Sequence, residues 1–250
     1  MTGLITALWR HPIKSLGRET LTRTQLSAGQ AMPWDRHWAV LHDLAPHDGN
    51  AWGPCQNFMI GTRVPSLAGV WATLDEATAT VTLRHQRLGS HSFCPDDAGA
   101  TAAFFAWLAP ILPEDRAQPR RIVSAGSRGM TDSDFPSVSI MNMSSHRSVA
   151  QRLGRSLEPE RWRGNLWFDG LAPWEEFDWI GRRVRIGSAV LQIRDRIERC
   201  MHTTANPVTG LRDTDVLGAL ETGWDHRDFG VYGEVIEDGT VATGDQIEVL

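Results

Sequence analysis

The sequence predicts a mainly β fold with some helices (α+β), in which a smaller β-rich N-terminal domain precedes a β-barrel domain. Short apolar or alternating segments follow one another closely, and turn-forming residues separate them. The 23 Gly and 13 Pro residues are spread over all 250 positions, without a repeat or a low-complexity tract. Hydrophobic residues make up 41% of the chain, which is enough for a sizeable core. We expect the domains to cover residues 1–117 and 118–250.

The first half of the chain reads mainly as strands. Each expected strand is apolar or alternating and ends at turn residues; these strands cover residues 4–9, 20–26, 37–41, 70–74 and 80–85. Residues 43–60 are rich in Pro, Gly, Asp and Asn and predict a long loop, which is either functional or irregular surface. Asp96 or Asp97 can cap a helix over roughly residues 98–112.

The second half begins with a linker at residues 113–121 and returns to strands. A strand is expected at residues 137–143, and Ser144 or Ser145 then starts a helix that ends at Gly154. Residues 184–197 are expected to form strand structure interrupted by a turn at Gly187. Two further strands are expected at residues 230–236 and 246–250.

Composition excludes several classes of protein. A net charge of −5 and a pI of about 6.0 argue against a general nucleic-acid binder. The longest nearly uncharged apolar stretch, residues 100–112, is too short to cross a bilayer, so we expect no membrane association. The N-terminal segment lacks the pattern of a secretory signal, which favours a cytoplasmic protein. Three cysteines without a CxxC motif predict neither a disulfide framework nor a four-cysteine iron–sulfur site.

Cys200 is the strongest candidate for chemistry, because it follows several arginines at the end of a predicted strand. If the strand continues to it, Arg194, Arg196 and Cys200 share one face. A thiol near guanidinium groups has a lowered pKa, and its thiolate attacks electrophiles or binds soft and high-valent metals. The turn-rich segment MHTTANPVTG that follows is typical of a loop beside a reactive residue. The alternative is a buried structural cysteine near surface arginines.

A second group of residues could bind an anion. Lys14 is the one lysine among 25 basic residues, and it lies next to Ser15 after a proline. An ammonium, a hydroxyl and backbone N–H groups can together hold a phosphate. The further candidates are Arg36, Arg163 and, at a predicted helix N-terminus that could also be merely capped, Ser144 and Ser145.

Several segments in the same order resemble the MOSC family, named for the C-terminal domain of molybdenum cofactor sulfurase. The resemblance is to the branch with an N-terminal β-barrel domain, which includes the mitochondrial amidoxime-reducing component. It covers nearly the whole chain and rests on PIKS (12–15), WDRHWAV (34–40), TRVPSL (62–67), RWRGNLWFDGLAPWEEFDW (161–179), RDRIERCMHTTANPVTG (194–210), FGVYGEV (229–235) and GTVATGDQIEVL (239–250).

The resemblance implies a molybdenum-cofactor oxidoreductase that reduces N-hydroxylated or N-oxide compounds. In relatives the cysteine of the Arg-Cys segment ligates the molybdenum of a molybdopterin, a role that falls on Cys200. Electrons would come from a separate donor protein of the ferredoxin or flavoprotein type, because some relatives carry a fused ferredoxin domain and this sequence has none. The implied phosphate and pterin contacts are Lys14, Ser15, Arg36, Arg163 and Arg199, with Ser144, Ser145 and Tyr232 as further contacts.

Other functions remain open at this stage. Cys200 could carry a persulfide and pass sulfur to a metal-cluster assembly system without redox chemistry. It could also serve a cysteine hydrolase with a distant histidine such as His226, or the domain could be inactive. Asn206-Pro207 stands where some relatives have Asp-Pro, and loop 43–60 matches no part of the family pattern, so the substrate is left undefined.

Overall fold

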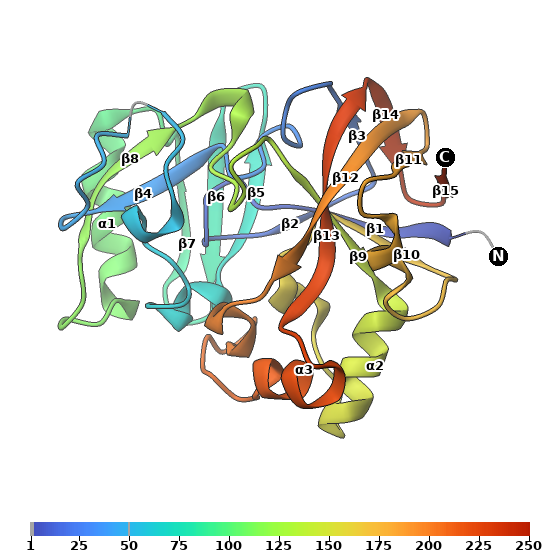
Figure 1. The fold of residues 1–250 in the computed structure, drawn as a ribbon. Coiled ribbons are helices and arrows are strands. Elements are labelled where there is room, and N and C mark those ends of the chain that lie inside the picture. Colours follow the sequence, from blue (N-terminus) through green and yellow to red (C-terminus); the bar gives the residue numbers. More distant parts are fainter. Residues whose placement is uncertain (1–2, 50) are drawn as a thin grey trace.

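The computed structural model describes residues 3–49 and 51–250, in which the chain forms fifteen strands and three α-helices. A β-barrel occupies one side of the molecule, and small sheets with one helix occupy the other (Figure 1). The predicted α+β fold, mainly of strands and with a barrel, is therefore confirmed. None of the helices in the described ranges is long and apolar enough to cross a membrane.

Seven strands close the barrel, because β1 (Gly3–Arg10) pairs with strands on both of its sides. β9 and β10 run parallel, and the other neighbouring strands of the barrel are antiparallel. From β1 the order around the barrel is β10 (Leu166–Asp169), β9 (Val138–Asn142), β13 (Asp228–Glu237), β12 (Ala189–Glu198), β11 (Arg183–Ile186) and β15 (Gln246–Val249).

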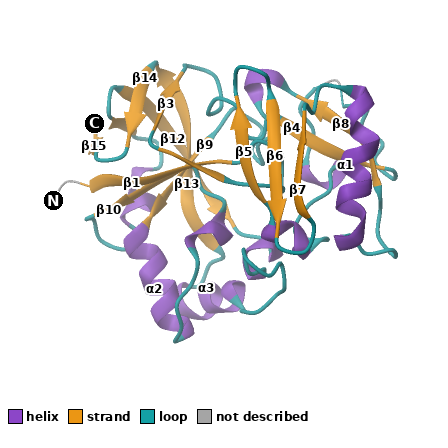
Figure 2. Ribbon diagram, turned by 180° about the vertical axis from the view of Figure 1, so that it is seen from behind, coloured by secondary structure: helices purple, strands orange, loops and turns teal. Residues whose placement is uncertain are grey.

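Smaller sheets surround the barrel. β2 (Glu19–Leu21) extends it beside β1, and β3 (Arg23–Leu26) pairs with β14 (Gly239–Ala242). On the other side of the molecule lie the pair β4 (Trp38–His42) and β8 (Pro119–Ser124) and the meander β5 (Trp71–Asp75), β6 (Thr80–His85) and β7 (Gly89–Phe93). Figure 2 shows this meander beside α1 (Thr101–Leu108).

Alternation of apolar and polar residues accounts for most of these strands. In β6, for example, Val81, Leu83 and His85 are buried, whereas the residues between them reach toward solvent. The side chains of β4 to β7 and α1 form one core around Trp38, Val81 and Phe104, and the barrel encloses a second core around Ile5, Val138 and Phe168.

Two helices cover the outside of the barrel. α2 (Met143–Leu153) and α3 (Val216–Trp224) lie below it in Figure 1. They pack over a third core in which the rings of Trp162 and Phe229 stack with centroids 3.8 Å apart. This core fixes the turn before β10 and the start of β13, both of which lie close to the cavity described below.

Strands pair across the predicted domain boundary. β1 belongs by sequence to the first expected domain but completes the barrel of the second. β8 follows residue 118 but pairs with β4 of the first half. The boundary itself stays a prediction, and the two halves are connected by shared sheets as well as by the chain.

Several local predictions need correction. Residues 20–26 form two strands rather than one, and the expected linker at 113–121 already contains the start of β8. α1 is shorter than expected, with 3₁₀ turns at Ala98–Ala100 and Ala109–Ile111 on either side. α2 starts at Met143, because Asn142 caps it by accepting a hydrogen bond from the Ser144 N–H. The strands β7, β10 and β14 and helix α3 were not predicted.

Candidate functional site

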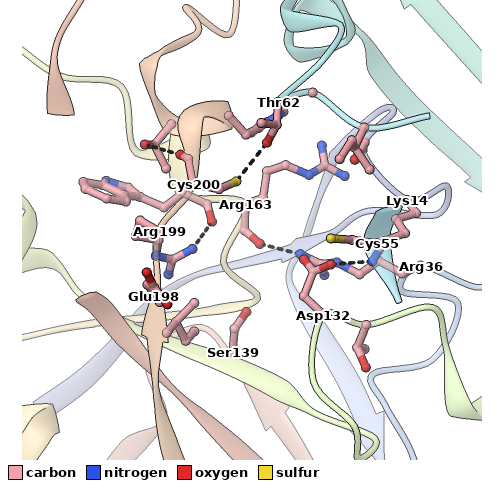
Figure 3. Close-up of a pocket in the computed structure, with 18 of the residues that line it drawn as sticks. Lys14, Arg36, Cys55, Thr62, Asp132, Ser139, Arg163, Glu198, Arg199 and Cys200 are labelled. Atoms are coloured by element: carbon pink, nitrogen blue, oxygen red, sulfur yellow. Dashed lines mark hydrogen bonds and ion pairs between the residues drawn. The ribbon is translucent and has the colours of Figure 1, made fainter. Parts of the chain in front are cut away.

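A single cavity brings together most of the residues that the sequence singled out. It lies between the segments around residues 14, 36 and 60 and the ends of the barrel strands β10, β12 and β13. Figure 3 shows Lys14, Arg36 and Asp132 on one side, Cys200 and Arg199 on the other, and Arg163 between them. The predicted residues that line it are Lys14, Ser15, Arg36, Arg163, Arg199, Cys200 and Tyr232.

Three of these residues sit at unusual backbone positions. Ser15, Arg36 and Arg163 have positive φ angles of 63°, 50° and 49°. A non-glycine residue in this region costs on the order of 1 kcal/mol, and such residues concentrate at functional sites. Ser15 and Arg36 lie within turns, Arg163 ends the 3₁₀ turn Pro159–Trp162, and all three residues line the cavity.

Lys14 and Asp132 form an ion pair at the side of the cavity. The ammonium of Lys14 is 2% exposed and donates to the carbonyl of Met130 at 2.7 Å and to Asp132 at 2.5 Å. Burial acts to raise the pKa of Asp132, but the charges of Lys14 and Arg36 prevail and lower it. The carboxylate therefore stays ionised and holds the ammonium at the cavity wall.

Arg36 connects the N-terminal half to the turn that carries Arg163. Its guanidinium pairs with Asp35 and donates to the Arg163 carbonyl at 2.9 Å. Asp35 also accepts from the His11 N–H at 2.8 Å. Despite burial, which opposes it, the pKa of Arg36 is raised by Asp35, so the guanidinium remains charged.

Arg163 carries a buried donor that no described residue satisfies. Its Nη1 donates to the Gly17 carbonyl at 3.1 Å, whereas Nη2 is buried without a partner. Burial, followed by repulsion from Arg36, lowers the pKa of Arg163 to about 9. A buried unpaired guanidinium N–H is costly, and an anion in the cavity would satisfy it.

Arg199 also lines the cavity, but its donors are used within the protein. Nη1 donates to the Trp162 carbonyl at 2.9 Å, and Nε donates to the Phe229 carbonyl at the same distance. Burial lowers its pKa to about 10. Arg199 therefore holds the turn before Arg163 against β13, whereas the resemblance implied a direct contact with the cofactor.

Cys200 is exposed at the opposite side of the cavity, two residues after β12 ends. The hydroxyl of Thr62 donates to its sulfur at 3.2 Å (Figure 3). Arg212 in turn donates to the Thr62 carbonyl at 2.6 Å. The N-terminal half thus contributes a direct hydrogen bond to the thiol.

The other two arginines of this segment do not line the cavity. The strand stops at Glu198 and is bulged before it, so the shared face expected for Arg194, Arg196 and Cys200 does not continue to the cysteine. Arg194 pairs with Glu234 at 2.5 Å, and Arg196 lies 3.9 Å from Asp228. Both are half exposed.

Sequence reasoning missed several polar residues of the cavity, of which four bear on the site. Thr62 lies in the quoted segment TRVPSL, but no motif marked its hydroxyl. Loop 43–60 contributes Cys55, the thiol pKa of which is raised by burial and by Asp132. Asp132 and His202 also line the cavity. Packing of the two halves brings Thr62 and Cys55 to Cys200, whereas His202 follows it directly in the chain.

His202 is buried in the 3₁₀ turn Met201–Thr204, directly after Cys200. Burial, followed by the charge of Arg163, lowers the pKa of His202 to about 3. The ring is therefore neutral at physiological pH. Tyr232 lies on β13 across the cavity, and burial raises the pKa of its hydroxyl, so the phenol stays protonated.

Ser144 and Ser145 lie elsewhere, in the first turn of α2, and they do not line this cavity. Protein carboxylates already occupy that helix end. Ser145 donates to Glu176 at 2.9 Å, as does Asn142 at 2.8 Å, and Arg147 bridges Ser144 to Asp169. The expected anion site at the α2 N-terminus is therefore filled by the chain's own acidic side chains.

We expect Glu176 to make stability depend on pH. Burial raises its pKa to about 7, although hydrogen bonds from Asn142 and Ser145 act to lower it. A carboxyl whose folded-state pKa is raised stabilises fully below its unfolded pKa, and that contribution is lost as pH rises through about 7. Glu176→Gln should therefore gain free energy of unfolding relative to the parent between pH 4.5 and 8, by about 3 kcal/mol. Urea titrations of both proteins across this range measure the difference, and a constant difference contradicts the prediction.

Comparisons with known proteins identify both halves of the chain. The family model described as MOSC domain matches residues 129–248, and that described as MOSC N-terminal beta barrel domain matches residues 2–101. Among solved structures, the YuaD protein from Bacillus subtilis aligns over 100% of this chain and 96% of its own, with 14% identity and a TM-score of 0.48. YiiM from Geobacillus stearothermophilus and YiiM from Escherichia coli each align over 45% of this chain and 53% of their own, at 19% identity and a TM-score of 0.35. No curated protein matches the sequence.

Proposed function

The chain belongs to the MOSC family, with the MOSC N-terminal β-barrel domain before its MOSC domain, and on this premise we propose that it is a molybdenum-cofactor-dependent oxidoreductase. Its substrates would be N-hydroxylated or N-oxide compounds. The observation that carries the proposal is the buried, unpaired Nη2 of Arg163 in the cavity that also exposes the Cys200 thiol.

The residues present fit a molybdopterin. A thiolate is a suitable ligand for a soft or high-valent metal, and Cys200 exposes its sulfur to the cavity. The phosphate of the pterin is an anion that would satisfy Arg163 Nη2, with the ammonium of Lys14 and the hydroxyl of Ser15 as further partners. When bound, the cofactor would supply two-electron chemistry and take up the oxygen of the substrate.

The chain's own groups bind, orient and balance charge. Lys14 and Arg36 add positive charge on the side of Arg163, and Asp132 offsets part of it. Thr62 directs the sulfur of Cys200. Overall, two electrons and two protons convert an N-hydroxylated compound into the deoxygenated product and water. The electrons would come from a separate donor protein of the ferredoxin or flavoprotein type.

A sulfur carrier is the second candidate function. The exposed sulfur of Cys200 also suits a persulfide that passes sulfur to a metal-cluster assembly system. A carrier, however, gives no partner to the buried guanidinium of Arg163. The hydrolase that pairs Cys200 with His226 has less support, because His226 packs between Trp174 and Phe177 and does not line the cavity.

Metal analysis separates these candidates. Protein purified from a host that makes the cofactor is expected to contain molybdenum in near-stoichiometric amounts and to reduce an N-hydroxylated compound with reduced viologen as donor. A molybdenum-free protein that accumulates persulfide on Cys200 in the same host would overturn the proposal in favour of the carrier.

We expect the purified protein not to oxidise NADH in the presence of substrate. The sequence has three cysteines and no fingerprint for a flavin or nicotinamide cofactor, so these residues offer no group that would accept electrons from NADH. NADH oxidation can be followed optically with and without reduced viologen as an alternative donor. Robust NADH-driven turnover by the homogeneous protein contradicts the prediction and indicates a second cofactor site.

A further inference from the structure

His202 has no hydrogen-bond partner for its ring among the described residues, although only 9% of the residue is exposed. It lines the cavity two positions after Cys200. Buried polar side chains almost always have a partner, and those without one are explained by strain, by a bound water or ligand, or by a functional role. Because the ring makes no hydrogen bond within the described residues, a ring nitrogen that reaches the cavity is free to bind a ligand, and the two nitrogens must be distinguished.

Nδ1 of His202 faces the backbone of Gly61. A Cβ added to Gly61 would lie 1.7 Å from this nitrogen, so the glycine packs directly against it. A hydrogen on Nδ1 would point toward the α-carbon of Gly61, which offers no acceptor. A bare Nδ1 leaves an unfilled acceptor there, which is less costly than an N–H pressed against a C–H group.

Since the packing of Gly61 disfavours a hydrogen on Nδ1, the ring hydrogen lies on Nε2. Nδ1 is buried without a partner, whereas Nε2 is not among the buried unpaired atoms, and His202 lines the cavity. The cavity is the one that contains the thiol of Cys200. Gly61 thus determines which ring nitrogen carries the hydrogen, and this places a hydrogen-bond donor on the residue that shares the cavity with the thiol.

We propose that Nε2–H of His202 donates to the oxygen of the bound N-hydroxylated or N-oxide substrate, and so selects it over a deoxygenated compound of the same shape. This inference rests on the proposed reductase function and names a substrate-binding residue for it. A site built to hydrogen-bond a ligand oxygen rejects the analogue that lacks it, because the donor is then left unpaired. The deoxygenated product loses the same hydrogen bond and is released.

The first experiment locates the hydrogen without any reaction. Nitrogen-15 NMR of histidine-labelled protein at pH 7.5 distinguishes the two tautomers of His202, with His202→Gln used to assign its signals. The expected result is a protonated Nε2 and a bare Nδ1. A hydrogen on Nδ1 overturns the proposal.

The second experiment measures substrate selection in the molybdenum-loaded enzyme. For benzohydroxamic acid, His202→Leu is expected to raise KM about tenfold, the effect of one lost hydrogen bond, at unchanged molybdenum content. Inhibition by benzamide, which lacks the N-hydroxyl, should stay the same. His202→Gln should restore KM, because its amide nitrogen replaces Nε2, whereas His202→Asn replaces Nδ1 and should not.

Two results count against the proposal in this assay. One is a His202→Leu variant with unchanged KM and unchanged molybdenum content. The other is a variant that loses molybdenum at unchanged KM, which means that Nε2 binds the cofactor and not the substrate. If the parent protein reduces nothing, the proposed function fails first. NMR titration of His202 then decides alone: the Nε2 signal should shift with benzohydroxamic acid and not with benzamide, and equal shifts overturn the inference.

Discussion

Cys200→Ser is expected to abolish molybdenum binding and reductase activity while the protein stays folded. Serine has nearly the same shape, but its hydroxyl is not ionised at neutral pH and is a poor substitute for a thiolate. Loss of residues that merely support a metal ligand typically costs 10- to 100-fold in affinity or activity, so loss of the ligand itself should cost more than about 100-fold. The fold should survive because the side chain is exposed and accepts one hydrogen bond, from Thr62.

The other two cysteines serve as matched controls. Cys55 lines the same cavity and Cys94 does not. Cys55→Ser therefore tests whether losing another thiol of the cavity has the same effect as losing Cys200. Both variants are expected to keep molybdenum and activity within about twofold, since neither removes the ligand. Metal analysis, the viologen assay and the melting temperature are measured together. If Cys200→Ser reduces N-hydroxylated compounds as well as the parent, Cys200 is not the metal ligand.

Arg163→Met is expected to weaken cofactor retention without destabilising the cofactor-free protein. A hydrogen bond from a charged donor is worth about 1.5–3 kcal/mol, which corresponds to about 10- to 150-fold in affinity. The empty cavity, in contrast, leaves Nη2 of Arg163 buried and unpaired. Methionine removes that cost and keeps much of the volume, but it also removes the hydrogen bond from Nη1 to the Gly17 carbonyl, so the melting temperature of the cofactor-free protein should be nearly unchanged.

Two further variants test the specificity of this result. Arg194→Met removes an arginine that pairs with Glu234 outside the cavity, and it should change retention less than about twofold. Lys14→Met should weaken retention but also lower the melting temperature, because Asp132 and the Met130 carbonyl lose their partner. Equal molybdenum occupancy in Arg163→Met and the parent, under dilute and cofactor-limiting conditions, argues against a phosphate at this position.

Local pattern was sufficient for most of the strands and for the cavity residues that belong to sequence motifs. Alternation of apolar and polar residues predicted β6 at residues 80–85, and the structure has the same bounds. Lys14 and Ser15 line the cavity. Short strands without alternation, such as β10, were missed because burial on both faces removes the period of two. The helix α3 was missed because its cap, Asp215, lies within a turn-rich segment.

Contacts between distant segments could not be predicted from local pattern. Glu176 reaches the start of α2 from a turn 31 residues beyond Ser145, so the sequence shows a capping serine and not the carboxylate that occupies the helix end. Thr62 is 138 residues from Cys200, and only the packing of the two halves brings the hydroxyl to the sulfur. The family resemblance implied that Arg199 contacts the cofactor. In the structure its Nε and Nη1 donate to the backbone carbonyls of Phe229 and Trp162.

The insertion of β1 between β10 and β15 has a consequence for how the chain folds. β1 has neighbours near residues 166–169 and 246–247, so the ring of hydrogen bonds cannot close until residues 246–247 are available. Contacts of such long sequence separation require the closure of large loops, which slows folding. Until then β10 and β15 present unpaired edges, which are sites of non-native strand association. The barrel that carries the Cys200 segment therefore closes only when β1 meets β15, at the far end of the described residues.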